Sequence, residues 1–452
     1  MSAGELEMGW SQDPTMYTKY HVLTTLGSGS YGKVVEAVKK AAPGAAGDGA
    51  GATEGSAAYG STKSKKHTEE HRAIKLQDFS TSRPGITEEQ LRDVSMLQMM
   101  DHPNVVKVYE SWLDAEQRRL YMAMELAAHG DLYRFMRNVR NVPDPDNPGQ
   151  TMEIYVRKVL KPKQVKRFMF QILLGLAYMH LKRVVHRDLK PANILVAGRK
   201  GRELLKLTDF GHARQIEGWP LMNHSDPKYL GTSGYRGPEL ILGMRKYGGG
   251  GDIWAAGCIF LELATGARPF RDSTEYGSLI KMIRVLGLPP KEELKKLNME
   301  TYNRMCHTLP HVAQKPRDEV KTALREVIDD VRVPMPDDEQ FSLLFDLWRF
   351  NPNERLTAHE ALNHPYFDDL DKSEFTHWGH DLGFTFNRPT PDAEADKPRY
   401  ELRSRKVRKA DQELQRPSKK IKIETEEIHL GSAAASSMAK PKDNHRKKRK
   451  AH

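Results

Sequence analysis

Cysteine and long apolar runs are what this sequence most lacks. It has 2 cysteines among 452 residues, Cys258 and Cys306, which are too few for a disulfide framework or a four-ligand zinc site. We expect both to be reduced thiols of an intracellular protein, with Cys258 a small core residue. No run of about 18 apolar residues occurs, so we expect no membrane span. The first 14 residues do not have the pattern of a secretory signal.

An excess of one charge is also missing from most of the chain. The 71 Lys and Arg outnumber the 60 Asp and Glu by 11, and residues 397–452 hold 18 basic and 7 acidic side chains, which is the whole excess. Residues 1–396 are formally neutral, with 53 residues of each sign. This balance excludes a uniformly basic protein that coats nucleic acid or acidic lipid, and predicts a neutral folded body with a basic tail.

The first 125 residues alternate between strand patterns and interruptions. Residues 17–40 alternate polar and apolar side chains around a glycine-rich turn, which predicts two strands. Residues 41–70 are rich in Ala, Gly and Ser, so we predict a disordered insertion. Strand character resumes at 71–78, helical spacing of apolar residues predicts a helix over 86–101, and two short strands follow.

From residue 131 onward the pattern is mainly helical. Short apolar strands are predicted near 194–196 and 205–207, and the last apolar cluster lies near 366–367. Beyond about residue 380 the chain is Pro-rich and then charged, which predicts a disordered tail. We find no internal repeat.

A glycine-rich stretch fits the pattern G-x-G-x-x-G-x-V. Its residues are Leu26, Gly27, Ser28, Gly29, Ser30, Tyr31, Gly32, Lys33 and Val34. Glycines at this spacing let backbone amides approach phosphates without a Cβ clash, although a plain hairpin turn explains the stretch equally well. A P-loop would need Ser or Thr at position 34, and a dinucleotide-binding turn would need a helix next.

The segment Ala73-Ile74-Lys75 follows this hairpin. A lone strand lysine is usually solvated, but one placed between apolar stretches after a glycine-rich turn is a candidate for binding nucleotide phosphates.

The most specific motif is H-R-D-L-K-P-A-N over residues 186–193. Its five fixed positions match H-R-D-L-x-x-x-N. Transfer of a phosphoryl group to a hydroxyl needs a carboxylate that accepts the proton, and an amide oxygen that holds magnesium. Asp188 and Asn193 can supply both from one loop. Asp209-Phe210-Gly211 begins 16 residues after Asn193 and adds a second carboxylate.

Gly237-Pro238-Glu239 completes the set of motifs, followed by Asp252-Ile253-Trp254 and Arg355. A buried Glu239 would need a cationic partner, and Arg355 is the candidate.

In this order the motifs resemble those of eukaryotic protein kinases over about residues 20–367. The resemblance implies an α+β bilobal fold, with a small antiparallel β lobe that contains one key helix and a large, mainly helical lobe. The kinase domain would span 17–367, with the large lobe and its trailing segment over 128–380. An N-terminal extension over 1–16 and a basic disordered tail over 381–452 would flank it.

The same resemblance implies ATP and Mg²⁺ as cofactors. The glycine-rich loop would cover ATP, and the further ATP-site residues would be Ala73, Lys75 with Asp93 as its partner, the gatekeeper Met124, and Glu125 and Ala127 of the adenine-binding hinge. Asp188 would be the catalytic base, and Lys190 in H-R-D-L-K-P indicates serine/threonine specificity. Asn193 and Asp209 would bind the metal.

Residues 86–100 resemble the cyclin-contacting helix of cyclin-dependent kinases, which implies a cyclin subunit docked there. Arg92 matches the arginine of the usual run, but Asp93 stands where a glutamate is expected. Since aspartate is one methylene shorter, its ion pair with Lys75 needs a closer helix or will be weaker. Glu88 and Glu89 lie one turn earlier and are poorer candidates.

Residues 235–239 resemble the W-Y-R-A-P-E of the same group, without its tryptophan. By resemblance, Arg236 supports a strained backbone at Gly231, which tolerates positive φ. This predicts proline-directed specificity. Thr232 and Ser225 are candidate phosphoacceptors.

Three arginines match the cluster that binds an activating phosphothreonine in relatives: Arg92, Arg187 and Arg214. The hypothesis is that Asp226 replaces the phosphate; a solvated loop aspartate is an equal alternative.

The stretches KPANILV, GRKGR and MELAAHGDL resemble the Mediator-associated kinase whose partner is cyclin C. Asp209-Phe210-Gly211 and Asp93 depart from that pattern. The resemblance implies protein substrates in transcription by RNA polymerase II, with Mediator as a further partner.

The tail carries three basic clusters, RSRKVRK, RPSKKIKIE and HRKKRK. They predict nuclear import, while direct nucleic-acid binding is less favoured and a tail without function is a further alternative.

The resulting prediction is a serine/threonine kinase of cyclin-dependent type. Three alternatives stay open: another cyclin-dependent kinase acting in the cell cycle, a low-activity or pseudokinase scaffold, and a nucleic-acid-binding protein acting through its tail.

Overall fold

The computed structural model describes residues 14–29, 32–40, 70–78, 86–144, 147, 150–158, 160–216, 231–243, 248–288, 315–327 and 336–375. All of them belong to the first of two units of the chain, residues 1–396. The predicted insertion, apart from Glu70, and the whole tail lie outside the described residues. So do Ser30, Tyr31, Ser225, Asp226 and Cys306.

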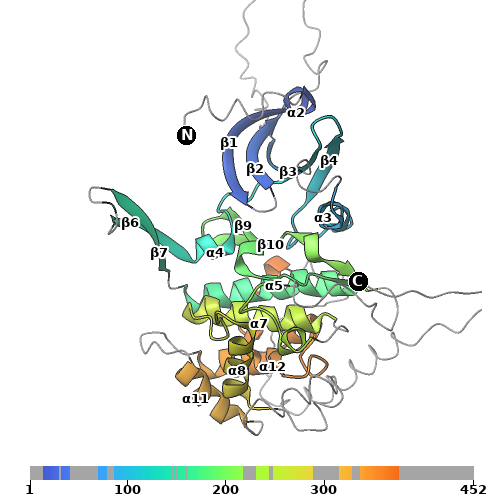
Figure 1. Cartoon of the computed structure of the whole chain (residues 1–452). Helices are drawn as coiled ribbons and strands as arrows, with labels where there is room; N and C mark the ends of the chain where they lie inside the picture. Colours follow the sequence, from blue (N-terminus) through green and yellow to red (C-terminus); the bar gives the residue numbers. More distant parts are fainter. Residues whose placement is uncertain are drawn as a thin grey trace, which may run out of the picture. The chain divides into compact units, whose positions relative to one another are not determined.

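The small lobe is a five-stranded antiparallel sheet in the order β1-β2-β3-β5-β4 (Figure 1). Its strands are β1 Tyr20–Gly29, β2 Gly32–Lys39, β3 His71–Asp78, β4 Val108–Asp114 and β5 Arg119–Glu125. Helix α2, Pro14–Lys19, buries Met16 in a cluster with Tyr20, Ile74 and Tyr121. The antiparallel lobe predicted from the sequence is confirmed.

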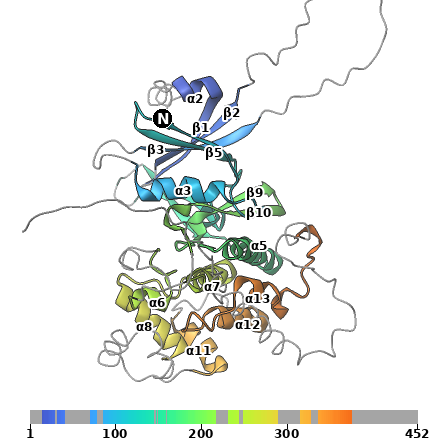
Figure 2. The ribbon, with the colours of Figure 1, turned by 90° about the vertical axis from the view of Figure 1, so that its right-hand side faces the viewer.

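Helix α3, Glu88–Gln98, lies beside this sheet (Figure 2). It begins at Thr87, whose side chain accepts from Gln90 N while the Gln90 side chain accepts from Thr87 N, so the first turn is capped in both directions. Val94 and Leu97 face the main core. The same face of the helix buries Arg92 and Asp93, which turns two charged side chains towards the interior.

The large lobe is mainly helical, as the sequence predicted. Its helices are α4 Leu132–Phe135, α5 Pro162–Leu181, α6 Pro238–Ile241, α7 Gly250–Thr265, α8 Glu275–Leu286, α11 Arg317–Val327, α12 Asp338–Leu347 and α13 Ala358–Leu362. Most residues of α5 and α7 are buried, because both helices carry apolar side chains on nearly all of their faces. The hairpin of β9 Ile194–Arg199 and β10 Arg202–Leu207 and the short pair β8 Val184–Val185 and β11 Arg214–Gln215 flank the motif residues.

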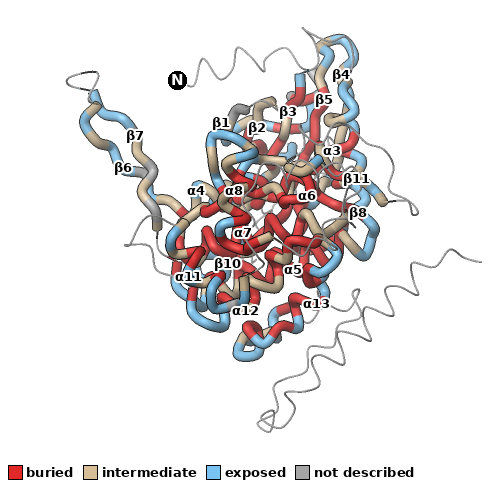
Figure 3. Tube along the Cα trace, turned by 60° about the horizontal axis from the view of Figure 1, so that its bottom comes forward, coloured by how far each residue is buried: buried red, intermediate tan, exposed pale blue. Residues whose placement is uncertain are grey.

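Two elements differ from the prediction. Helix α2 covers residues 17–19, which were predicted to begin a strand, and one hairpin of the large lobe was not predicted. In place of continuing helix after residue 131, β6 Arg137–Pro143 and β7 Thr151–Arg157 form a separate two-stranded antiparallel sheet. The run DPDNPG between them has no helix-forming stretch, since its prolines lack the N–H that a helix needs. This arm projects from the large lobe, and its described side chains are exposed or half-buried (Figure 3).

In the part of the chain that the structure describes, no helix is long and apolar enough to cross a membrane. Cys258 is buried in α7, and burial raises the pKa of its thiol, which keeps the sulfur protonated.

Candidate active site

A side chain of helix α7 holds the backbone of the loop formed by residues 186–193. The carboxylate of Asp252 accepts backbone N–H groups of His186 and Arg187, both at 2.9 Å, and lies 2.9 Å from His180 Nε2. Burial alone would raise the pKa of Asp252, but the hydrogen bonds from His180 and the backbone lower it. A buried anion therefore fixes the backbone just before Asp188.

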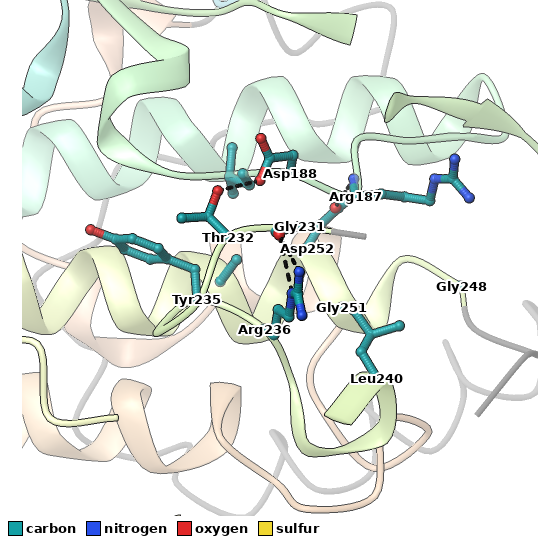
Figure 4. A pocket seen from close by; sticks show the side chains of 12 residues that line it. Arg187, Asp188, Gly231, Thr232, Tyr235, Arg236, Leu240, Gly248, Gly251 and Asp252 are labelled. Atoms are coloured by element: carbon teal, nitrogen blue, oxygen red, sulfur yellow. Dashed lines mark hydrogen bonds between the residues drawn. The ribbon is translucent and has the colours of Figure 1, made fainter. Parts of the chain in front are cut away.

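Asp188 takes part in a cluster of polar side chains, and its contact with Thr232 can be seen in Figure 4. Its carboxylate accepts from Lys190 Nζ at 2.7 Å, from Thr232 Oγ1 at 2.7 Å and from Asn193 Nδ2 at 3.2 Å. Lys190 Nζ also donates to Thr232 Oγ1 at 2.8 Å. A carboxylate fixed in this way can orient a hydroxyl and accept its proton, with an ammonium group beside the reacting atoms.

Lys75 and Asp93 form an ion pair across the small lobe. Lys75 Nζ lies 2.6 Å from Asp93 Oδ2, and the side chains are 13% and 2% exposed. Burial lowers the pKa of Lys75, but the carboxylates of Asp93 and Asp209 outweigh it and raise that pKa. The helix thus comes close enough for the shorter side chain, which answers the question that the sequence left open.

The same helix contacts the Asp209-Phe210-Gly211 segment. Asp93 Oδ1 accepts the Phe210 N–H at 2.8 Å, and Arg92 Nη1 donates to Gly211 O at 2.7 Å. One short carboxylate therefore joins β3, α3 and this segment, because its two oxygens point to different partners. A longer side chain would have to be accommodated at a residue that is 1% exposed.

Asp209 adopts left-handed backbone angles, φ 65° and ψ 71°, an uncommon conformation for a residue with a Cβ. Its Oδ1 lies 4.0 Å from Lys75 Nζ. Burial raises the pKa of Asp209, and the cation of Lys75 opposes the shift. A carboxylate in this environment is a good ligand for a further cation.

The donor set here fits a divalent metal that is shared with phosphates. Among the described residues, no group of three or more His, Cys, Asp and Glu could enclose a metal ion. Asp209 and Asn193 instead offer one carboxylate and one amide, and magnesium characteristically takes few protein oxygens together with phosphate and water. The residues present therefore fit a metal that arrives with a nucleotide.

The described residues of the glycine-rich stretch lie where β1 ends and β2 begins, and Gly29 pairs there with Gly32. Gly32 has φ 117°, and a Cβ there would lie 1.9 Å from the backbone oxygen of Leu76, so only glycine fits. Ala73 pairs with Met124 across β3 and β5, and both residues are buried.

The predicted hinge residues, Glu125 and Ala127, lie at the end of β5 and just after it. The carboxylate of Glu125 lies 2.6 Å from Lys206 Nζ and accepts from Lys107 N at 2.9 Å. The Glu125 N–H also donates to Lys107 O at 3.0 Å, and Ala127 O accepts from Gly130 N at 3.3 Å. The carboxylate and N–H of Glu125 are therefore engaged within the protein, and the predicted contact of these residues with adenine stays a prediction.

The backbone at Gly231 has φ 75°, as the sequence predicted. Arg236 donates to Gly231 O through Nε at 3.1 Å and through Nη2 at 2.8 Å, and also pairs with Glu275. Gly231, Arg236 and Asp188 line a pocket together with Thr232 and Leu240 (Figure 4).

Beneath this pocket, Arg355 makes the predicted ion pair with Glu239. Nη1 and Nη2 each lie 2.7 Å from a carboxylate oxygen, and both side chains are 0% exposed.

The three arginines of the predicted phosphate cluster meet near the end of the Asp209-Phe210-Gly211 segment. Arg92 lies 3.1 Å from Glu88, and Arg214 lies 3.7 Å from the same carboxylate. Arg187 Nε donates to His212 O at 2.5 Å. Asp226 lies outside the described residues, so its suggested role stays a prediction.

Sequence reasoning missed two contributors to the site. Thr232 was considered only as a phosphoacceptor, whereas its hydroxyl bridges Asp188 and Lys190. His180 carried no sequence signal, because its partner Asp252 lies 72 residues away.

Comparison with known proteins agrees with this geometry. The protein kinase domain family matches residues 52–367. The chain is 31% identical over 353 residues to the cell division control protein 2 homolog 3 of Trypanosoma brucei brucei, which covers 78% of this chain and 93% of that protein. It is 30% identical over 366 residues to the cyclin-dependent kinase B1-1 of Arabidopsis thaliana, which covers 79% and 99%. The chain therefore belongs to the protein kinase family, as an ATP-using serine/threonine kinase similar to cyclin-dependent kinases.

Proposed function

We propose that the chain is a cyclin-dependent, proline-directed kinase that uses Mg²⁺ with ATP and acts in the nucleus as a Mediator kinase in transcription by RNA polymerase II. The observation that supports its catalytic part is the polar cluster at Asp188, which brings a carboxylate, the ammonium of Lys190 and the amide of Asn193 together.

The residues divide the work of the reaction. Asp188 orients the substrate hydroxyl and accepts its proton, while Lys190 stabilises negative charge on the transferred group. Lys75 binds the ATP phosphates and is held in place by Asp93. Asn193 and Asp209 would hold Mg²⁺, which supplies charge neutralisation of the phosphates when bound.

Proline specificity follows from the backbone at Gly231. Its carbonyl already accepts two hydrogen bonds from Arg236, so an N–H of the residue after the phosphoacceptor would find no acceptor there. Proline has no N–H to leave unsatisfied, and an unsatisfied buried donor costs about 1–3 kcal/mol. Two peptides that differ only in Ser-Pro against Ser-Ala should differ about tenfold or more in kcat/KM. Equal values would reject the proposal.

A cyclin partner is supported by the outer face of α3. Its inner face holds the ion pair with Lys75, whereas Leu91 on the helix and Met99 at its C-cap are 52% and 55% exposed. Leu113, in the neighbouring strand β4, is 51% exposed. Affinity purification followed by identification of the bound subunit tests the proposal. Leu91→Glu should abolish recovery of the cyclin, and Leu181→Glu, at an exposed leucine of α5, is the matched control.

Nuclear action is supported by the three basic clusters of the tail. A fluorescent fusion of the full chain should accumulate in the nucleus, and removal of residues 397–452 should abolish this accumulation while kinase activity stays. A fusion that stays nuclear without the tail would reject the import role. Co-purification of Mediator subunits separates the proposed role from that of a cell-cycle kinase.

A further inference from the structure

The β6–β7 arm is the largest feature of the described structure that the catalytic account leaves unexplained. Two strands alone are marginally stable in water, and in the described part of the chain no third strand pairs with either of them. Met152 is 41% exposed, and Val142, Ile154 and Val156 alternate with it on one face of the pair according to the register. Such an element, held apart from the lobe, has an open edge and an apolar face available for a partner.

The base of the arm is connected through buried side chains to the pocket that Asp188 lines. Arg137, the first residue of β6, lies 2.9 Å from the fully buried carboxylate of Glu262 and stacks 3.5 Å over the ring of Tyr133. Glu262 also accepts the hydroxyl of Tyr235, which lines the pocket beside Asp188. The arm is therefore anchored two side chains away from the place where a substrate would lie.

Hydrogen bonding makes the two edges of the arm unequal. In an antiparallel ladder, pairs that exchange backbone hydrogen bonds alternate with pairs whose N–H and C=O groups point outward. The bonds from Asp144 N to Gln150 O and from Lys158 N to Met136 O show which pairs are of the first kind. By that alternation, the pairs Asn141–Glu153 and Pro143–Thr151 direct their backbone groups outward. Pro143 has no N–H to offer, so it blocks pairing along the β6 edge. The described β7 edge contains no proline.

Charge selects the partner. Residues 131–163 contain 7 Lys and Arg against 4 Asp and Glu, and the basic residues gather at the base. Arg134, Lys161 and Lys163 are exposed there, and Arg140 is exposed in the middle of β6. An acidic segment would be attracted to this end of the arm.

We propose that the β7 edge of the arm is a docking site for an extended, acidic segment of a protein substrate, with acidic and apolar side chains in alternation. The segment adds a third strand to the β6–β7 sheet through main-chain hydrogen bonds. The proposal rests on the kinase function above. Docking raises the local concentration of the phosphoacceptor at the cleft, without a change in the chemical step.

The test compares two synthetic substrates in the active complex of the full chain. One is a short Ser-Pro peptide, and the other is the same peptide joined by a flexible Gly-Ser linker to eight alternating Glu and Val residues, with the extension tried at either end. We expect the extension to lower KM about tenfold and to leave kcat unchanged. A Lys-Val extension of equal length should give no gain.

A matched pair of variants separates edge docking from general damage. Glu153→Pro removes an outward N–H from β7, and Asn141→Pro makes the same change at the opposite position of β6. We expect Glu153→Pro alone to abolish the tenfold gain, while both variants phosphorylate the short peptide normally. Equal KM for the two substrates in the wild type, or equal loss in both variants, would overturn docking at β7. Inactivity of the wild type towards the short peptide would instead contradict the kinase function.

Discussion

Replacing Asp93 by glutamate, the residue expected here in a cyclin-dependent kinase, should weaken this protein. Asp93 is 1% exposed, and its two oxygens meet Lys75 Nζ at 2.6 Å and Phe210 N at 2.8 Å. An added methylene in a close-packed site forces neighbouring side chains or the backbone to shift, at about 1–3 kcal/mol. We therefore expect Asp93→Glu to lower the free energy of unfolding by that amount and to reduce kcat/KM.

Asp93→Ala should be more damaging. It leaves the buried ammonium of Lys75 without its nearest anion and the Phe210 N–H without an acceptor, and loss of one partner of a buried pair costs about 3–5 kcal/mol. Glu89→Ala is the control, since Glu89 is 45% exposed and pairs with His212 at 3.3 Å, and such exposed pairs contribute at most about 1 kcal/mol.

Urea unfolding of the three variants and the wild type measures the free energies, and steady-state phosphorylation of one peptide measures activity. If Asp93→Glu equals the wild type in both, then α3 adjusts freely to side-chain length, and the close approach of this helix is not specific to aspartate.

Three further predictions concern other parts of the site. Gly231→Ala places a Cβ 3.0 Å from Arg187 O at φ 75° and should cost about 1–2 kcal/mol, measured by thermal unfolding; an unchanged melting temperature would contradict the strain. Arg355→Ala leaves the buried Glu239 unpaired and should cost about 3–5 kcal/mol in urea unfolding; a loss below about 1 kcal/mol would show that the pair contributes little. Burial raises the pKa of Asp209, so protons compete with Mg²⁺ for this carboxylate at a higher pH than they would at a free aspartate. The rise in melting temperature that Mg²⁺ causes with a non-hydrolysable ATP analogue should therefore shrink as the pH falls. Asp209→Asn should remove that pH dependence, and a rise independent of pH in the wild type would refute the assignment.

Much of the fold could be predicted because its signals are local. The alternation in β1 and β2, the helical spacing of α3 and the apolar strands β9 and β10 each lie within a few consecutive residues. Asp188 and Asn193 could be identified for the same reason, since one loop carries both and their spacing follows the chemistry.

The features that could not be predicted are contacts between residues that are close in space but far apart in the sequence. Thr232 reaches Asp188 across 44 residues, and Arg137 reaches Glu262 across 125 residues. Such pairs depend on how segments that are distant in the sequence pack together, which no local pattern encodes. The β6–β7 arm was missed because its strands contact little of the core, so the usual contrast between a buried and an exposed face is weak.

The proposed kinase function depends most on catalysis of phosphoryl transfer at the Asp188 cluster. The direct measurement is incorporation of radiolabelled γ-phosphate from ATP into a Ser-Pro protein by the purified chain with its bound cyclin, wild type against Asp188→Asn. Removal of a general base typically costs about 10²–10⁴-fold in rate, and we expect a loss in that range for Asp188→Asn, with binding of ATP retained. Equal incorporation by both proteins would place the chemistry elsewhere, and no incorporation by the wild type would favour a scaffold that only binds.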